Sequence, residues 1–142
     1  MYNSKFTVAI HLLTLIACNN HGEGCDSEEA AKSVNTNPVV VRRILGVLRE
    51  KGLVKSKSGR GGGWQLAKKP EDITLGEIYS ILEENEPIFA MHTNKPSESC
   101  SVGKNIGTVL SKHYLQAEKA MNKELSLVTV STILKDIQKI EN

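Results

Sequence analysis

Apolar residues recur at helical spacing along most of the chain, and each such stretch predicts one helix. The first stretch covers residues 4–18, where a stripe of apolar side chains repeats every three or four positions: Phe6, Ala9, Ile10, Leu13 and Ile16 or Ala17. This spacing is typical of an amphipathic helix. The Asn- and Gly-rich run at 19–24 ends it, because these residues tolerate backbone conformations that helices exclude.

Residues 26–51 predict two shorter helices joined by a tight turn. Asp26 or Ser27 caps the first, which continues to Val34. The turn is 35–37. Pro38 follows at the first position of the next helix, where its missing N–H costs no hydrogen bond because that N–H has no partner within a helix. In the helix 38–51 one face is apolar, and three arginines point away from it: Arg42, Arg43 and Arg49. This is a helix-turn-helix pattern.

The next segment alternates like a strand, turns at glycines and alternates back. Residues 53–58 form the first strand, 59–63 a glycine-rich loop with Arg60, and 64–67 the second strand. A β-hairpin with a basic tip directly behind a recognition helix is a wing. We interpret Trp64 as a core residue behind this wing rather than as a stacking platform.

The second half of the chain is helical. Residues 74–77 form a capping box that opens a helix to about residue 84, and the Pro-, Ser- and Asn-rich stretch 85–102 is a loop. A long helix begins at Gly103 with a narrow seam, and a last helix covers about 129–140. A seam with few other partners buries best against its own copy. The predicted dimer interface comprises Ile106, Leu110, Ala117 and Met121.

These elements define the expected fold. It is mainly α with a small β-hairpin: a winged helix-turn-helix domain plus a long C-terminal dimerisation helix. The expected divisions are a DNA-binding domain at 1–84, a loop at 85–102, and the dimerisation helix with a closing C-terminal helix at 103–142.

Charge is unevenly distributed although the net charge is only +2. Residues 1–69 carry 11 Lys and Arg against 5 Asp and Glu, whereas residues 70–142 carry 7 against 11. Between Arg42 and Lys69 there are nine basic residues and one acid, Glu50. Such asymmetry is typical of a surface that binds the phosphates of nucleic acid, although a solvated basic face remains the alternative.

The candidate DNA contacts follow from these positions. Arginines early in a recognition helix reach base edges or phosphates, and both roles stay open for Arg42 and Arg43. Thr36 and Asn37 can bind phosphate through side chains and backbone N–H groups. The wing tip can reach the backbone or the minor groove. The predicted DNA-binding residues are Thr36, Asn37, Val39, Arg42, Arg43, Lys55, Lys57, Ser58 and Arg60.

Several of these motifs together resemble the Rrf family of winged-helix repressors. They are residues 28–31, the run 48–54 (LREKGLV), the wing segment 61–67 (GGGWQLA) and 73–78 (ITLGEI). The resemblance covers nearly the whole chain. It implies a homodimeric transcriptional repressor that is not an enzyme, with crossed long helices and one winged domain on each operator half-site. Two residues depart from the family pattern: Arg42, where members that hold a cluster tend to have a carboxylate, and Ser58, where the wing has an arginine. We therefore do not expect the sequence preference of the relatives to carry over.

The resemblance also bears on cofactors. Cluster-binding members place three cysteines before the long helix, whereas this chain has only Cys100 there. An iron–sulfur cluster needs about four protein ligands, so we expect no cofactor. Cys100, before a helix N-terminus and near Lys104, is either a redox-sensing thiol or silent. The trio Cys18, His21 and Cys25 has near-ligand spacing for zinc but matches no standard pattern, so no metal is expected.

The remaining expectations concern location and competing functions. No apolar run approaches the length of a membrane span, and the first 17 residues lack the plan of a signal peptide, so we expect a cytoplasmic protein. Double-stranded DNA and a second copy are the expected partners, and the effector, a small molecule or an oxidant, is open. The alternative is an adaptor that binds a partner through its long helix, with weak salt dependence. An enzyme is a distant third, because no catalytic motif is present.

Overall fold

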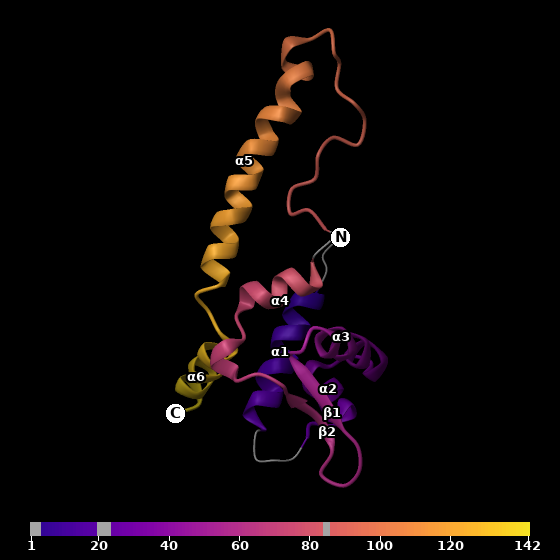
Figure 1. Cartoon of the computed structure of the whole chain (residues 1–142), viewed down its shortest axis with the longest axis vertical. Helices are drawn as coiled ribbons and strands as arrows, with labels where there is room; N and C mark the ends of the chain where they lie inside the picture. The colour runs from indigo at the N-terminus through magenta and orange to yellow at the C-terminus, as the bar shows by residue number, and fades with distance from the viewer. Residues whose placement is uncertain (1–3, 20–23, 84–85) are drawn as a thin grey trace.

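Helix α1 (Lys5–Cys18) lies at the centre of the winged-helix body in the computed structural model, which describes residues 4–19, 24–83 and 86–142. It contacts α2, α3, α4, α6 and β2 (Figure 1). Because elements pack on several sides, α1 is apolar well beyond one stripe. Its buried side chains are Ala9, Leu12, Leu13, Thr14, Ile16 and Ala17. The helix predicted at 4–18 is confirmed.

The helix-turn-helix consists of α2 (Ser27–Val34) and α3 (Pro38–Glu50). Asp26 caps α2, since its side chain accepts a hydrogen bond from Glu28 N at 2.8 Å. Asn35 ends α2 in the left-handed conformation, with φ of 63°, which asparagine tolerates better than most residues. The three-residue turn therefore forms as predicted, and α3 crosses at an angle that exposes one face.

The wing is an antiparallel hairpin of β1 (Val54–Lys57) and β2 (Gly63–Leu66). Strand β1 is one residue shorter at each end than the predicted strand 53–58, and β2 begins and ends one residue before the predicted strand 64–67. Val54 pairs with Leu66, and Ser56 with Trp64. A third segment joins on the other side of β2, where Cys25 and Trp64 exchange two backbone hydrogen bonds of 2.8 Å. The sequence pattern did not indicate this third segment, because a single bridging residue has no periodicity.

The second half contains a short 3₁₀ helix, η1 (Pro70–Asp72), and helices α4 (Leu75–Leu82), α5 (Ser101–Leu125) and α6 (Val130–Glu141). The long helix begins two residues before the predicted Gly103. The capping box predicted at 74–77 is only half formed. Thr74 Oγ1 accepts from Glu77 N at 3.0 Å, but the Glu77 carboxylate turns to Lys68 Nζ at 3.1 Å instead.

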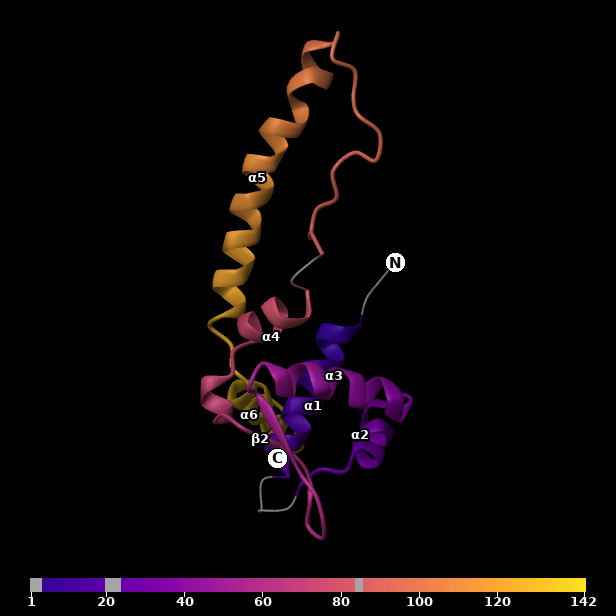
Figure 2. The ribbon, with the colours of Figure 1, turned by 45° about the vertical axis from the view of Figure 1, so that its right-hand side comes forward.

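Helix α6 packs with the body, although the sequence analysis grouped it with the long helix in the segment 103–142. It lies against α1 and η1, with Val130 buried and Leu134 packed on the core. Backbone bonds from Leu75 N to Val128 O and from Val130 N to Ile73 O fix its start, both at 2.9 Å. Helix α5 projects from the body, and residues 86–100 run outward alongside it, without helix or strand, to the far end where α5 begins (Figures 1 and 2).

Candidate nucleic-acid interface

Helix α3 divides cleanly into a buried and an exposed face. Its core face consists of Val41, Ile44, Leu45 and Leu48. The opposite face carries Arg42, Arg43 and Arg49, all exposed, and Val39, which is 50% exposed. Gly46 lies between these arginines, and a Cβ added there would have nothing within 4 Å. An exposed basic helix face with an open centre suits a recognition helix in a major groove.

The N-terminus of α3 is occupied by its own cap. Asn37 Oδ1 accepts from Val39 N at 2.9 Å, and Asn37 O accepts from Val40 N and Val41 N at 3.0 and 3.3 Å. Thr36 N donates to Ala31 O at 2.9 Å. The N–H groups of Thr36 and of the first turn of α3 are therefore bonded within the chain. The phosphate contacts predicted for Thr36 and Asn37, through side chains and backbone N–H groups, stay a prediction.

The wing displays the predicted basic residues. Lys55, Lys57, Ser58 and Arg60 are all exposed on β1 and the loop after it. Its glycines have a steric role beyond flexibility. A Cβ at Gly62 would lie 2.2 Å from Lys57 O, and one at Gly63 would lie 2.7 Å from Cys25 O. Glycine thus lets the loop fold tightly over β1 and lets β2 reach Cys25, which fixes where the tip points.

Arg49 is a candidate contact that the sequence list omitted. Its guanidinium carbon lies 5.5 Å from the centroid of the Trp64 ring, within cation–π distance. Trp64 is half-buried and packs against the core, as predicted, so its ring is a firm support. Arg49 thereby joins the end of α3 to the wing. The sequence could have indicated Arg49 as a DNA contact, because it follows Arg42 by seven residues, which is two helical turns along the same face.

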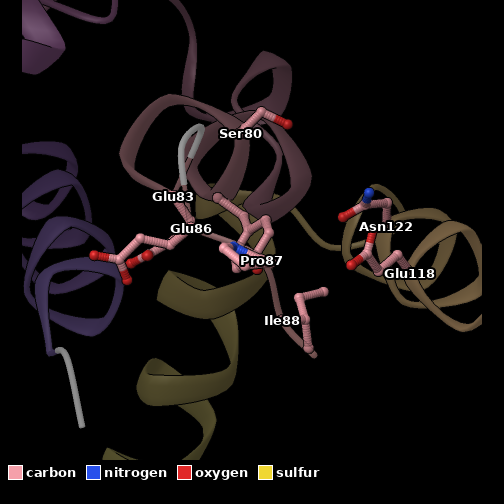
Figure 3. Close-up of a pocket in the computed structure, with 8 residues that line it drawn as sticks. Ser80, Glu83, Glu86, Pro87, Ile88, Glu118 and Asn122 are labelled. Carbon is pink, nitrogen blue, oxygen red and sulfur yellow. The ribbon is translucent and has the colours of Figure 1, made fainter. Parts of the chain in front are cut away.

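Acidic side chains gather elsewhere, between α4 and α5. Glu83, Glu86 and Glu118 line a cavity of about 490 Å³ there, with Ser80 and Asn122 also on its wall (Figure 3). Burial, followed by the charges of these three carboxylates, raises the pKa of Tyr79. Like charges repel DNA, so this side of the molecule is unsuited to it. The α3 and wing surface is the one that fits a duplex.

The predicted dimer seam on α5 is partly occupied within the chain. Phe89 stacks on Tyr114 with 4.6 Å between ring centroids, and Leu110 borders a hollow shared with Met91. Ile106, Leu110 and Met121 are half-buried, while Ala117 is exposed. Two large apolar side chains beside this seam are exposed, Val102 at 68% and Val109 at 51%. The exposed part of α5 thus includes these valines as well as Ala117, and the predicted dimer seam stays a prediction.

The three cysteines lie in different environments. Cys100 is exposed at the N-cap of α5, and the backbone N–H groups of Gly103 and Val102 lower its pKa by favouring the thiolate. Cys25 is buried, and burial together with the nearby Glu29 raises its pKa. Cys18 is exposed at the end of α1. Whether Cys100 senses an oxidant stays a prediction.

The described residues hold no cluster of metal-ligating side chains. In the part of the chain that the structure describes, no three His, Cys, Asp or Glu side chains gather in a way that could hold a metal ion. His21, the middle member of the candidate zinc trio, lies outside the described residues. Its partner Cys25 is 2% exposed and bonded into the wing through its backbone. The absence of a cofactor therefore remains an expectation.

A basic recognition helix with a glycine-rich wing defines the class, the winged helix-turn-helix DNA-binding proteins. No helix within 4–19, 24–83 or 86–142 has the length and apolar character that a bilayer span requires.

Comparisons with known proteins agree with this class. The model of the Rrf2 family, described as "Iron-dependent Transcriptional regulator", matches residues 2–136. YwnA of Bacillus subtilis (strain 168), named as a candidate HTH-type transcriptional regulator, is 42% identical over 137 residues, which are 96% of either chain. The chain belongs to the Rrf2 family. It is a transcriptional regulator and not an enzyme, as the sequence analysis expected.

Solved structures support the fold. A candidate DNA-binding protein of known crystal structure is 34% identical with a TM-score of 0.72, over 92% of this chain and 99% of that one. T. potens IscR has a TM-score of 0.76 at 21% identity, over 100% of this chain and 91% of that chain. The predicted winged-helix fold is confirmed.

Proposed function

We propose that this regulator is a homodimeric, sequence-specific repressor that binds double-stranded DNA in the cytoplasm. The observation that carries the proposal is the shared orientation of Arg42, Arg43 and Arg49 on one exposed face of α3. The wing lies beside this face and adds Lys55, Lys57 and Arg60. A helix in the major groove with a wing on the adjacent backbone uses all six cations.

The two arginines in the middle of the face have the clearest roles. Arg42 and Arg43 are exposed, and neither forms a salt bridge with a carboxylate of the described residues. Both are therefore free to bind guanine or phosphate, and a bidentate contact to guanine contributes about 1–3 kcal/mol of discrimination. Arg60 at the wing tip adds a phosphate or minor-groove contact.

A homodimer fits the rest of the molecule. The exposed face of α5 carries Val102, Val109 and Ala117, and these side chains gain most by packing on a second copy. Two-fold pairing presents two recognition helices to a palindromic site. A dimer bound across a promoter represses by occupying it.

The test is selection from a random duplex pool, followed by fluorescence anisotropy across a salt series. We expect a palindromic site and a steep salt slope, because each neutralised phosphate contributes about −0.9 to the slope of log K against log salt. Arg42→Ala/Arg43→Ala should remove sequence preference and reduce the slope by about two per subunit.

Lys135→Ala/Lys139→Ala is the matched control. It removes the same charge from exposed positions on α6, away from the recognition helix, and should leave the slope nearly unchanged. If wild-type protein enriches no sequence and binds with a flat slope, the proposal is wrong. The long helix would then be examined as an adaptor surface for a protein partner.

A further inference from the structure

An apolar cavity of about 450 Å³ lies between α1 and α6, on neither the basic face nor the exposed face of α5. Ligand pockets for small molecules are commonly 300–1,000 Å³ and mostly apolar, with a few placed polar groups. The apolar wall is formed by Ile10, Leu15, Ile133, Leu134 and Ile137. Ile137 is 45% exposed although it lies on the stripe of α6 that faces the body, so the two helices do not fill the space between them.

The described residues that line this cavity include few polar groups. His11 Nε2 lies 2.9 Å from Ser33 Oγ at one side, and among the described residues no Asp, Glu, Lys or Arg lines the wall. Thr14 Oγ1 already donates to Ile10 O at 2.7 Å. Because an unpaired charge is costly to bury among apolar groups, the lining selects against charged ligands. Hydrogen bonding is concentrated at His11 and Ser33.

We propose that this α1–α6 cavity binds a neutral, largely apolar small molecule that carries one hydroxyl group. The apolar part of the ligand packs between Ile10, Leu134 and Ile137, and the hydroxyl group hydrogen-bonds to the His11–Ser33 pair. No charged group on the ligand is needed.

The position of the cavity gives the ligand a route to the DNA-binding face. Helix α1 packs directly against α2 and α3, while α6 follows α5 after a short turn, with Leu127 and Val128 between them. A ligand between α1 and α6 changes how the two helices pack and thus the angle between the recognition helix and α5. This effect on DNA binding rests on the proposed function; ligand binding itself does not.

The first experiment measures binding of N-phenyl-1-naphthylamine, a neutral apolar fluorescent probe, to the full chain without DNA. We expect enhanced fluorescence that saturates at one probe per chain. 4-Butylphenol should displace the probe at much lower concentration than 4-butylbenzoate, which has the same apolar part but carries a charge. Equal competition by the two compounds would contradict the assignment of a neutral ligand.

Two substitutions on α6 separate the cavity from the general surface. Ile137→Arg places a charge in the cavity wall and should weaken probe binding at least tenfold, whereas Ile140→Arg should not, because Ile140 is 84% exposed and outside the lining. Both variants are measured for oligomeric state by sedimentation. Equal binding in both, or none in wild type, overturns the proposal. Loss of the dimer in Ile137→Arg alone would identify the occupant as a second copy and also overturn it.

A chemical readout does not depend on any variant. Cys18 lies in the cavity wall and is exposed, whereas Cys100 is exposed far from it and acts as an internal reference. Saturating 4-butylphenol should slow iodoacetamide labelling of Cys18 several-fold, as measured by peptide mass spectrometry, with Cys100 unchanged. An unchanged Cys18 rate at saturating ligand would place the ligand elsewhere and contradict the proposal.

Discussion

At the scale of single residues, Arg49 shows how a neighbour decides what an exposed side chain can do. The Trp64 ring beneath it holds the guanidinium where α3 meets the wing. An exposed cation–π contact of this kind contributes about 0.5–1 kcal/mol. The same contact limits the freedom of a side chain that would otherwise lose entropy on binding DNA.

Arg49→Gln should therefore weaken DNA binding at every sequence and reduce the salt slope by about one per subunit. Arg49→Lys keeps the charge but loses the planar guanidinium that stacks on Trp64, so it should restore the slope with only part of the affinity. Anisotropy titrations at several salt concentrations measure both quantities. A wild-type slope in Arg49→Gln would show that Arg49 does not contact DNA.

The cysteines provide a second prediction at this scale. The pKa of Cys100 is lowered by backbone N–H groups, whereas that of Cys25 is raised by burial. Because the thiolate is the nucleophile, native protein at pH 7 should alkylate at Cys100 at least tenfold faster than at Cys25. The Cys100 rate should fall only as the pH drops below its lowered pKa. Similar rates at the two residues, read by peptide mass spectrometry, would refute this order.

Many single-residue roles were readable from the sequence because they are local. Asp26 and Thr74 cap helices through hydrogen bonds to residues two or three positions away, as their place before a helical pattern indicated. The partner of Glu77 was predicted wrongly, since Lys68 lies nine residues away and beyond the capping motif. The Arg49–Trp64 contact joins residues on different elements and had no local signal.

At the scale of elements, two glycines in the DNA-binding half have opposite roles. Gly46 lies on the exposed face of α3 with open space around it, and Gly62 is enclosed by the carbonyl oxygens of Lys57 and Gly59. The sequence marked Gly62 as part of a flexible tip. The structure shows that close packing of the backbone also requires it.

Gly46→Ala should stabilise the protein by about 0.5–1 kcal/mol, because the backbone loses less conformational entropy on folding into a helix at an alanine than at a glycine. Gly62→Ala should destabilise it by about 1–3 kcal/mol, because its Cβ forces the wing backbone apart. Urea denaturation of the two variants provides a matched comparison. Stabilisation by Gly62→Ala would show that the wing is not folded as described.

At the scale of the whole molecule, the position of α5 matters most. It projects from the body, and residues 86–100 pack along one side of it (Figure 2). The part of its surface that carries Val102 and Val109 is exposed. The seam predicted from the sequence includes residues in different surroundings: Leu110 is half-buried beside residues 90–93, whereas Ala117, two turns further on, is exposed. The apolar pattern of a single helix does not indicate whether a given residue is covered by a loop of the same chain or by a second copy.

Val109→Glu should therefore weaken dimer formation by about tenfold or more, since an uncompensated carboxylate would be buried at the interface. Thr108→Glu adds the same charge one residue earlier, about 100° around the helix, and should leave the dimer largely intact. Sedimentation equilibrium measures both. Equal dimer stability in the two variants would show that the Val109 face is not the interface.

The sequence by itself determined the helix-turn-helix, the wing, the long helix and the basic character of residues 42–69, because caps, periodicity and local charge are short-range properties of the chain. Tertiary structure decided what depends on distant contacts. It brought Cys25 to β2, Trp64 beneath Arg49, α6 onto α1, and residues 86–100 onto one face of α5. These contacts join segments far apart in sequence, and burial, not local preference, selects them.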